Sequence, residues 1–207
     1  MTQSFDFQFR LATVDDADAI SAIYNQTIVG GGYSPQLQTT HQDDMRTTLR
    51  NWRRQGNPVW VFLHEGKIIA WSCIHPIVWG PELCFRTADF SVYVERSWYG
   101  QGVAIQAVLL AFDQAPRHGF ESISAWILSK NRKSSMLARA FRLQRWGVLP
   151  QAAHYGDDVF DVEIWGRRYS DVPWVNHVET LRTRIMRRAQ LRSGADCETP
   201  ENLLVTS

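Results

Sequence analysis

The sequence predicts a mixed α/β domain in which helices cover one central sheet. Apolar residues alternate or run continuously over short segments typical of strands, and elsewhere recur at helical spacing. The first strands along the chain are separated by tight turns, whereas later ones are separated by a helix, so hairpins come first and a βαβ unit follows. With 207 residues, 44% of them hydrophobic and 21% charged, the chain can bury a core without disulfides or metals.

The individual elements follow from local patterns. Thr13 and Asp16 form a capping-box-like helix start, with Asp where Glu or Gln is commoner. The glycines at 30–32 end that helix and open a loop to about residue 38. Pro116 and Gly119 are expected to stop a later helix. We predict strands at 7–11, 59–64, 67–74, 87–94, 122–128 and 159–169, and helices at 17–28, 40–55, 103–114, 132–145 and 175–192.

The composition shifts after Asp171-Val172-Pro173, and we divide the chain into a domain at 1–169 and an appendage at 170–207. We expect the helix at 175–192 to place Arg182 and its other arginines opposite Val178 and Leu181, and the polar tail after it to be disordered. An arginine-rich face could bind an acidic partner or nucleic acid. A solvated face packed on the domain or on a second subunit is the alternative, and the alternating charges favour it.

Overall charge and hydropathy exclude several partners. The 22 basic and 21 acidic residues give a net charge of +1, so we expect no nucleic acid and no membrane among the partners. No apolar run is long enough to span a bilayer and residues 1–8 lack a signal-peptide pattern, so a cytoplasmic location is expected. The three cysteines have no CxxC spacing. Cys73, His75 and Cys84 could supply metal ligands, but two buried thiols and a loop histidine fit better, and no metal is predicted.

The most informative segment is S-V-Y-V-E-R-S-W-Y-G-Q-G-V-A at 91–104, a strand followed by a glycine turn and a helix start. Such a turn directs several backbone N–H groups and the positive end of the helix dipole at one point. Gly100 and Gly102 would let a pyrophosphate approach the main chain closely. The segment lacks the lysine of a P-loop and the third glycine of a dinucleotide fingerprint, and a plain structural turn remains an alternative.

This segment resembles the GNAT superfamily of acetyl-CoA-dependent N-acetyltransferases, which carries Q/R-x-x-G-x-G/A between its fourth strand and third helix. Tyr99 departs from that pattern, because the family has Arg or Gln there. The resemblance covers about residues 9–169 and is nearest to phosphinothricin-type acetyltransferases. Four further passages support it, namely the R-L-A-T-V-D-D-A-D-A-I-S-A-I-Y-N opening at residue 10, T-A-D-F-S-V-Y-V at 87–94, Asn131 with Ser134, and D-V-E-I-W at 161–165.

The resemblance implies a mostly antiparallel sheet with splayed strands, flanked by helices, and acetyl-CoA as cosubstrate. Pantetheine would pair with the fourth strand like an added strand, and a backbone N–H near Tyr93 or Val94 would stabilise the oxyanion. Asn131 could hydrogen-bond the pantetheine arm or simply cap a helix. The expected cofactor-binding residues are Val92, Tyr93, Val94, Gly100, Gln101, Gly102, Val103, Ala104, Asn131 and Ser134.

Asp89 fills the family's catalytic glutamate position, one methylene shorter. An attacking amine must lose a proton, and a carboxylate can accept it directly or through water. An ordinary aspartate, with a pKa of about 3.9, is a weak base for this, so a relay water or a raised pKa is needed. Pairing with Arg86 is the structural alternative. Tyr155 is the candidate acid that protonates the leaving thiolate.

The acceptor amine is expected to bind between the loops at 30–41 and 74–86, where Tyr33, His75 and Trp79 are the candidate substrate-binding residues. The first of these loops does not reproduce the phosphinothricin pattern, so the substrate's identity is not carried over. The helix predicted at 132–145 is longer than the family's, and Trp146-Gly147-Val148 would stand in for the family's L-G-F/Y signature.

The leading prediction is therefore an acetyl-CoA-dependent N-acetyltransferase acting by direct attack on the primary amine of a small molecule, such as an amino acid or an analogue of one. The alternative is a catalytically weak acyl-CoA-binding regulator on the same scaffold, because Tyr99 and Asp89 both depart from the family pattern. The acyl-chain preference and the oligomeric state are left open, with a homodimer as one option.

Overall fold

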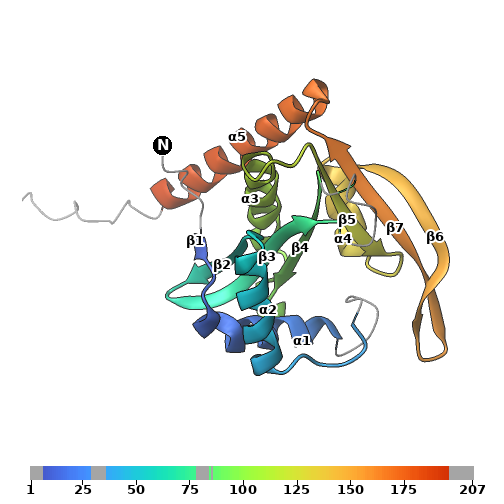
Figure 1. Ribbon diagram of the computed structural model, residues 1–207. Coiled ribbons are helices and arrows are strands. Elements are labelled where there is room, and N and C mark those ends of the chain that lie inside the picture. Colours follow the sequence, from blue (N-terminus) through green and yellow to red (C-terminus); the bar gives the residue numbers. More distant parts are fainter. Residues whose placement is uncertain (1–6, 29–35, 78–83, 85, 196–207) are drawn as a thin grey trace, which may run out of the picture.

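The computed structural model of the chain describes residues 7–28, 36–77, 84 and 86–195, the last eight of these as backbone only. An open seven-stranded sheet runs in the order β1-β2-β3-β4-β5-β7-β6 (Figure 1). Its strands are β1 Gln8–Leu11, β2 Val59–His64, β3 Lys67–Pro76, β4 Thr87–Val94, β5 Ser122–Leu128, β6 Gln144–Tyr155 and β7 Asp158–Arg168. The helices are α1 Ala17–Ile28, α2 Gln42–Arg54, α3 Val103–Arg117, α4 Arg132–Ala140 and α5 Val172–Ala195.

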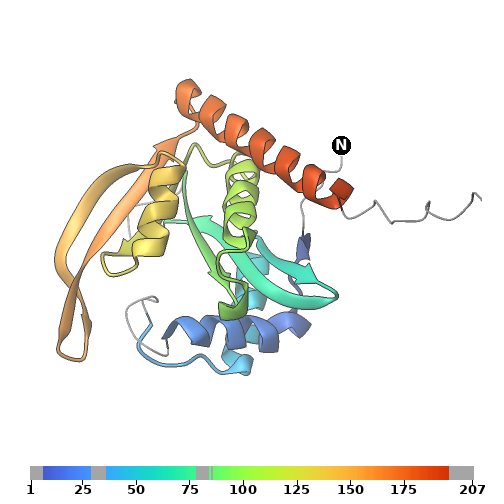
Figure 2. The same ribbon diagram turned by 180° about the vertical axis from the view of Figure 1, so that it is seen from behind.

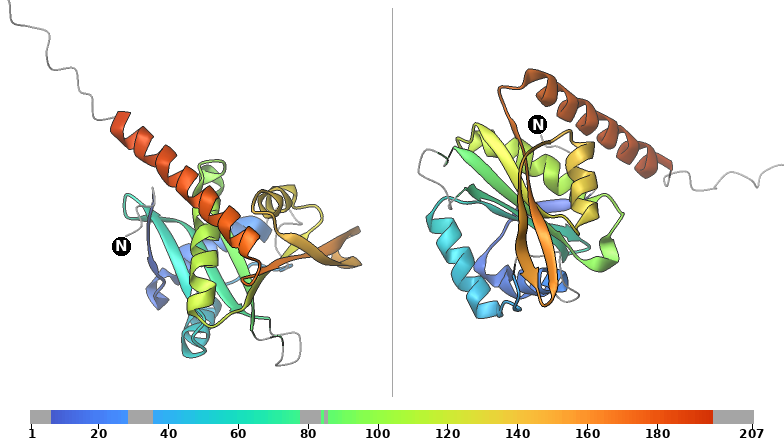
Figure 3. Two further views of the ribbon diagram at one scale, coloured as in Figure 1. Left: turned by 90° about the horizontal axis from the view of Figure 1, so that it is seen from above. Right: turned by 90° about the vertical axis from the view of Figure 1, so that its right-hand side faces the viewer.

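Every neighbouring pair of strands in this sheet is antiparallel except β4 and β5, which are parallel. Helices α1 and α2 cover one face, α3 and α4 cover the other, and α5 lies outside α3 (Figures 2 and 3). The predicted mixed, mostly antiparallel α/β fold is confirmed. Among the described residues, no helix is long and apolar enough to cross a membrane.

Side chains of β3 and β4 alternate between two apolar clusters, as the period of two in a strand requires. Ala88 and Val94 of β4 are buried in the larger cluster beside α3. Tyr93 packs into the smaller cluster with Trp71 and Cys73 of β3, beneath α1 and α2. Asp89 and Ser91 have the same strand parity as Tyr93, so they lie on the face that α1 and α2 cover.

The start of the first helix matches its sequence pattern. The Thr13 N–H donates to the Asp16 carboxylate at 2.7 Å, which is the expected capping contact. Arg10 of β1 adds two hydrogen bonds to the same carboxylate, at 2.7 and 2.8 Å. These contacts lower the pKa of Asp16, the Arg10 hydrogen bond having the largest effect.

Helix α3 continues through Pro116, where the sequence suggested a stop. Proline lacks an N–H and would leave the carbonyl four residues earlier, that of Phe112, without its helical donor. The Tyr169 hydroxyl donates to this carbonyl at 3.0 Å. A side chain from beyond β7 therefore replaces the missing helix bond, and the helix ends at Arg117.

Helix α4 ends at Ala140, five residues earlier than predicted, and the chain continues into β6, which the sequence reading missed. Arg142 adopts a left-handed φ of 54°. The Leu143 N–H donates to Ala138 O at 2.9 Å and the Arg142 N–H to Arg139 O at 2.9 Å, which is a Schellman motif. Phe141-Arg142-Leu143, rather than Trp146-Gly147-Val148, thus forms the turn after this helix.

Helix α5 begins three residues before the predicted helix and buries one of the arginines that we expected on its polar face. Trp174 and Val178 belong to the main core. The Arg182 side chain is only 10% exposed, with Nη1 3.4 Å from Asp113 Oδ1 of α3. Its Nη2 donates to Leu109 O at 3.4 Å. Arg184 and Arg187 are exposed, as predicted.

Candidate active site

The site is built where β4 and β5 separate. The two strands pair only over Thr87–Ser122, Ala88–Ile123 and Asp89–Ser124, although β4 continues to Val94 and β5 to Leu128. Beyond Asp89, β4 keeps β3 as its only partner among the strands that the structure describes. An open strand edge of this kind can accept an extended ligand as an added strand.

The register of β4 shows which backbone groups face this opening. Ile77 N–H donates to Thr87 O, and Glu95 N–H donates to Ile69 O, so the odd-numbered residues of β4 bond to β3. The N–H groups of Phe90, Val92 and Val94 therefore point toward β5. Of the two oxyanion donors considered from the sequence, Val94 has its N–H on the open side, whereas the Tyr93 N–H points toward β3.

The glycine turn follows β4 and a short 3-10 helix, Arg96–Trp98. Gly100 and Gly102 have φ values of 80° and 89°, which disfavour residues with a side chain. A Cβ added at either position would meet nothing within 4 Å, so open space lies above the turn. Gly102 is the N-cap of α3, and no acidic residue lies in the first turn. The residues fit a pyrophosphate held by backbone N–H groups at the helix start.

The start of α4 lies beside this turn. The ammonium of Lys133 is 4.3 Å from the centre of the Tyr99 ring. Asn131 caps α4, with its Oδ1 accepting from the Ser134 N–H at 3.1 Å. The capping role of Asn131 is therefore present, and its Nδ2 remains a donor that a pantetheine amide could use.

Asp89 lies at the last paired position before β4 and β5 separate. Its side chain is 18% exposed, and Oδ1 is fully buried with no hydrogen-bond partner among the described residues. Burial raises the pKa of Asp89 to about 7, and a hydrogen bond from the Phe90 backbone opposes that rise. This carboxyl can therefore act as a base near neutral pH, as the sequence argument required.

The groups around Asp89 exclude some alternatives. Arg86 pairs with Glu121, with Nη1 2.9 Å from Oε1, and not with Asp89. His75 lies on strand β3 rather than in a loop, with Nε2 3.8 Å from Asp89 Oδ2. Burial, with a smaller contribution from Asp89, raises the pKa of Cys73 to about 12, so its thiol stays neutral. The described residues contain no cluster of His, Cys, Asp or Glu that could hold a metal ion.

Other predicted site residues are not gathered here. Tyr155 lies at the tip of the β6–β7 hairpin, opposite Asp158 and 37% exposed. Asp89 pairs with Ser124, and Ser124 pairs with Gly166 of β7. Gly166 lies eight residues after Asp158, which corresponds to about 26 Å along the strand, so Tyr155 is far from Asp89. Tyr33 and Trp79 fall outside the described residues. The sequence analysis did not identify Lys133 and Trp52 as site residues. Lys133 contacts Tyr99 and Trp52 contacts His75, and in each pair the two residues are far apart in sequence.

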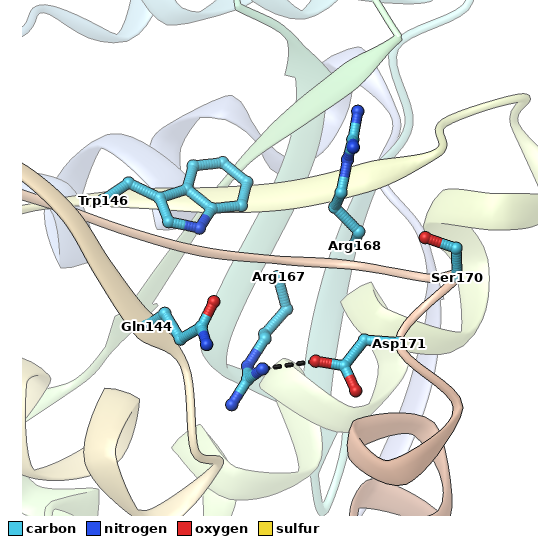
Figure 4. A pocket seen from close by; sticks show the side chains of 6 residues that line it. All are labelled: Gln144, Trp146, Arg167, Arg168, Ser170 and Asp171. Atoms are coloured by element: carbon cyan, nitrogen blue, oxygen red, sulfur yellow. Dashed lines mark hydrogen bonds and ion pairs between the residues drawn. The ribbon is translucent and has the colours of Figure 1, made fainter.

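The structure also contains a hollow at the opposite end of β7 from Tyr155, lined by Gln144, Trp146, Arg167, Arg168, Ser170 and Asp171 (Figure 4). Arg167 forms an ion pair with Asp171 and donates to Arg142 O at 2.8 Å. Trp146 covers Gly166 so closely that an added Cβ would clash with its ring. These contacts join β6 and β7 to the start of α5, and we assign the hollow to that junction.

A sheet that opens between two parallel strands, with a glycine turn leading into the next helix, is the arrangement that the resemblance to acetyl-CoA-dependent acyltransferases implied. The comparison with known families agrees. Residues 6–144, about two-thirds of the chain, match the model of the acetyltransferase (GNAT) domain, so the protein belongs to the GNAT family and is an N-acetyltransferase.

Two similar proteins carry the name phosphinothricin acetyltransferase. A protein of Bacillus subtilis (strain 168) named "Putative phosphinothricin acetyltransferase YwnH" is 28% identical over 162 residues, which span 78% of this chain and 98% of that protein. A crystal structure of a protein named a "putative phosphinothricin N-acetyltransferase" has a TM-score of 0.70 and 28% identity, covering 80% and 99% of the two chains.

A further structure supports the fold and the ligand of the neighbouring enzymes. The phosphinothricin acetyltransferase of Sinorhizobium meliloti, solved with acetyl-CoA, has a TM-score of 0.74 at 18% identity and covers 79% of this chain and 89% of its own. These three relatives are spanned almost whole, whereas about a fifth of the present chain lies outside each match.

Proposed function

We propose that this protein transfers the acetyl group of acetyl-CoA to the primary amine of a small molecule, an amino acid or a close analogue of one, with Asp89 accepting the amine's proton. The observation that carries the proposal is the position of Asp89, a largely buried carboxyl at the last pair before β4 and β5 separate. The relatives named for phosphinothricin support an acceptor of amino-acid size.

The proposed acetyl-CoA binding site follows from the open edge of β4 and the glycine turn after it. The pyrophosphate lies over residues 100–104, and the pantetheine arm pairs with the open edge of β4, where Val92 and Val94 offer their N–H groups. Asn131 contributes its Nδ2 from the start of α4. When bound, acetyl-CoA supplies a thioester carbonyl that a neutral amine can attack.

The chain's own residues then accept the proton of the amine and stabilise the negative charge that develops on the carbonyl oxygen. Asp89 takes one proton from the amine, directly or through water, so that nitrogen can form its bond to the carbonyl carbon. The Val94 N–H donates to the carbonyl oxygen as negative charge develops there. The carbon–sulfur bond breaks, the sulfur leaves with the electron pair, and it takes the second N–H proton from the nitrogen as the amide forms. Tyr155, which pairs with Asp158 at the tip of the β6–β7 hairpin, has no role in this proposal.

The test is a CoA-release screen with acetyl-CoA against amino acids, their sulfone and phosphinate analogues, polyamines and peptides. Asp89→Asn keeps the shape of the side chain but removes its basicity, so turnover of the best acceptor should fall about 100-fold or more. Asp89→Glu keeps a carboxylate and should retain most of the turnover. Acetyl-CoA affinity, measured by calorimetry, should be nearly unchanged in both variants.

Two results would contradict the proposal. Turnover of Asp89→Asn within about threefold of wild type from pH 6 to 9, with the chemical step limiting, would make Asp89 structural. Tight acetyl-CoA binding without CoA release for any amine would instead favour the regulator on a GNAT scaffold.

A further inference from the structure

His75 and Asp89 form a close pair of titratable groups at the site. They lie directly opposite each other in the β3–β4 ladder, so both side chains point to the same face of the sheet. The distance from His75 Nε2 to Asp89 Oδ2 is 3.8 Å, and the side chains are 22% and 18% exposed. At this distance the two groups are in ion-pair range but are not hydrogen-bonded, and contacts between catalytic groups often shorten in the reactive complex.

The orientation of the His75 ring is fixed from two sides. Its Nδ1 lies 3.0 Å from Pro76 O. A carbonyl oxygen can only accept, so Nδ1 carries the proton in this contact, and in the neutral ring Nε2 has a free lone pair directed at Asp89. Trp52 of α2 stacks on the ring, with centroids 6.2 Å apart and an interplanar angle of 21°.

The other groups facing Asp89 do not compete for its proton. From β3 and β4 these are the Cys73 thiol and the Tyr93 phenol, both with pKa values raised by burial and therefore neutral. From β5, Ser124 donates its hydroxyl hydrogen to Ala88 O at 3.1 Å. Helix α2 contributes Trp52, while its arginines at 50, 53 and 54 are exposed. Among the described residues, His75 is the titratable side chain within ion-pair distance of Asp89.

We propose that His75 is a positioning residue for Asp89, and that the proton taken from the acceptor amine is held between Asp89 Oδ2 and His75 Nε2. This inference rests on the proposed function. Before the reaction, Asp89 is a carboxylate and His75 is neutral. The proton that leaves the amine nitrogen binds Oδ2, and the new O–H donates to the Nε2 lone pair. No other group changes its charge.

This arrangement gives Asp89 a property that burial alone does not. A hydrogen bond from its neutral form to Nε2 increases its proton affinity, so the carboxylate is a stronger base for an amine.

The first experiment needs no acceptor. Imidazole ¹⁵N spectra of the full-length protein are recorded against pH, with His75→Phe identifying the His75 signals. We expect the Nδ1–H tautomer in the neutral ring, and a titration midpoint that moves by at least about 0.5 pH unit in Asp89→Asn, because an amide cannot exchange the proton. An Nε2–H tautomer, or a midpoint unchanged by Asp89→Asn, would overturn the proposal.

The second experiment follows the pH dependence of kcat with the acceptor found in the screen. His75→Phe keeps an aromatic ring against Trp52 but has no nitrogen, and His75→Gln is the second variant should the first fail to fold. Both should lower kcat about tenfold and move the acid limb of the profile to lower pH by about 0.5–1 unit, with acetyl-CoA affinity unchanged. His154→Phe, at an exposed position of β6, is the matched control and should change neither quantity.

The double variant separates the outcomes. If His75 acts through Asp89, adding His75→Phe to Asp89→Asn should cost no further turnover. Losses that multiply, or a His75→Phe variant that raises only the acceptor KM, would show that His75 contacts the acceptor instead and would refute the pair. If Asp89→Asn keeps full turnover while the ¹⁵N coupling is present, the proposed base and the shared proton both fail, and only the contact between the two side chains stands.

Discussion

The proposed catalytic role of Asp89 comes at the expense of stability. It interrupts an otherwise apolar strand, and burial raises its pKa to about 7 from an ordinary value of 3.8. Between these two values the folded chain binds a proton that the unfolded chain does not. The contribution of Asp89 to stability is therefore most favourable below about pH 4 and is lost as the pH rises through 7.

We predict that Asp89→Asn is more stable than wild type at pH 8.5, by roughly 2–5 kcal/mol, and that the difference shrinks steadily toward pH 5. The asparagine carries no charge to bury at high pH. Urea denaturation at several pH values measures this difference. A stability difference that does not vary with pH would show that Asp89 is ionised in the folded protein without penalty.

Gly102 is the residue that most directly tests the proposed phosphate-binding turn. Gly102→Asp introduces both a side chain and a negative charge into the open space above the turn, so acetyl-CoA affinity should fall at least about 100-fold in calorimetry. Gly119 is the matched control, because it has a similar φ of 84°, equally open space and a position after the other end of α3. Gly119→Asp should cause comparable backbone strain and leave the affinity within about threefold. Equal losses of acetyl-CoA affinity in the two variants would exclude a phosphate-binding role for the turn at Gly102.

These residues were predictable because their signals are local in sequence. A glycine turn between a strand and a helix, or a carboxylate within an apolar strand, can be recognised from a dozen residues. The choice of Val94 over Tyr93 as N–H donor depends on the β3 register, and the contact of His75 with Asp89 depends on a β3–β4 pairing. Neither is encoded in one segment, so the sequence could not supply them.

At the scale of elements, the sequence predicted β4 and β5 to the residue and failed around α4. The segment 132–145 keeps a helical apolar pattern, but its end is set by Arg142 in a left-handed conformation that arginine rarely adopts. Strand β6 is largely exposed and shows little alternation, because it lies at the sheet edge with one neighbour, β7. Such a strand is defined by its partner more than by its own residues.

The contact between Lys133 and Tyr99 joins the two elements that we propose hold acetyl-CoA. The family carries Arg or Gln where this chain has Tyr99, and the tyrosine ring holds a lysine ammonium from α4 beside the glycine turn. We predict that Lys133→Gln weakens acetyl-CoA binding about threefold to tenfold, and more at low salt, because a charge-assisted phosphate contact is lost.

Two controls sharpen this test. Lys130 also lies over an aromatic ring, that of Phe160 at 5.0 Å, and pairs with Asp158 of the hairpin. Lys130→Gln should therefore leave the affinity unchanged. Binding of S-acetylpantetheine, which has no phosphates, should not respond to Lys133→Gln. A loss of affinity for that ligand would mean that Lys133 only shapes α4.

At the scale of the whole molecule, α5 links parts of the domain that the sequence presents separately. Trp174 donates its indole N–H to Phe141 O at 2.9 Å, and His177 Nε2 lies 3.2 Å from Ala140 O, so both contact carbonyls at the end of α4. Arg182 contacts α3 through Asp113. The predicted boundary near residue 170 marks a change of composition, and the side chains beyond it pack into the same core.

Because α5 holds the end of α4, and α4 carries Asn131 and Lys133 at its start, a change in α5 should reach the cosubstrate site. Trp174 is 3% exposed and packs against Phe112 at 5.4 Å and Tyr169 at 5.6 Å between ring centroids. We predict that Trp174→Ala lowers the free energy of unfolding by about 3–5 kcal/mol and also weakens acetyl-CoA binding.

Trp174→Phe separates the two effects within this prediction. It keeps most of the ring packing and removes the hydrogen bond to Phe141 O, so its loss should be about 1–3 kcal/mol, since a buried carbonyl is left without its donor. Val175→Ala, at the neighbouring exposed position, should change stability by less than about 0.5 kcal/mol. Urea denaturation and calorimetry give both quantities. If Trp174→Ala unfolds more easily but binds acetyl-CoA as tightly as wild type, α5 stabilises the core without positioning α4.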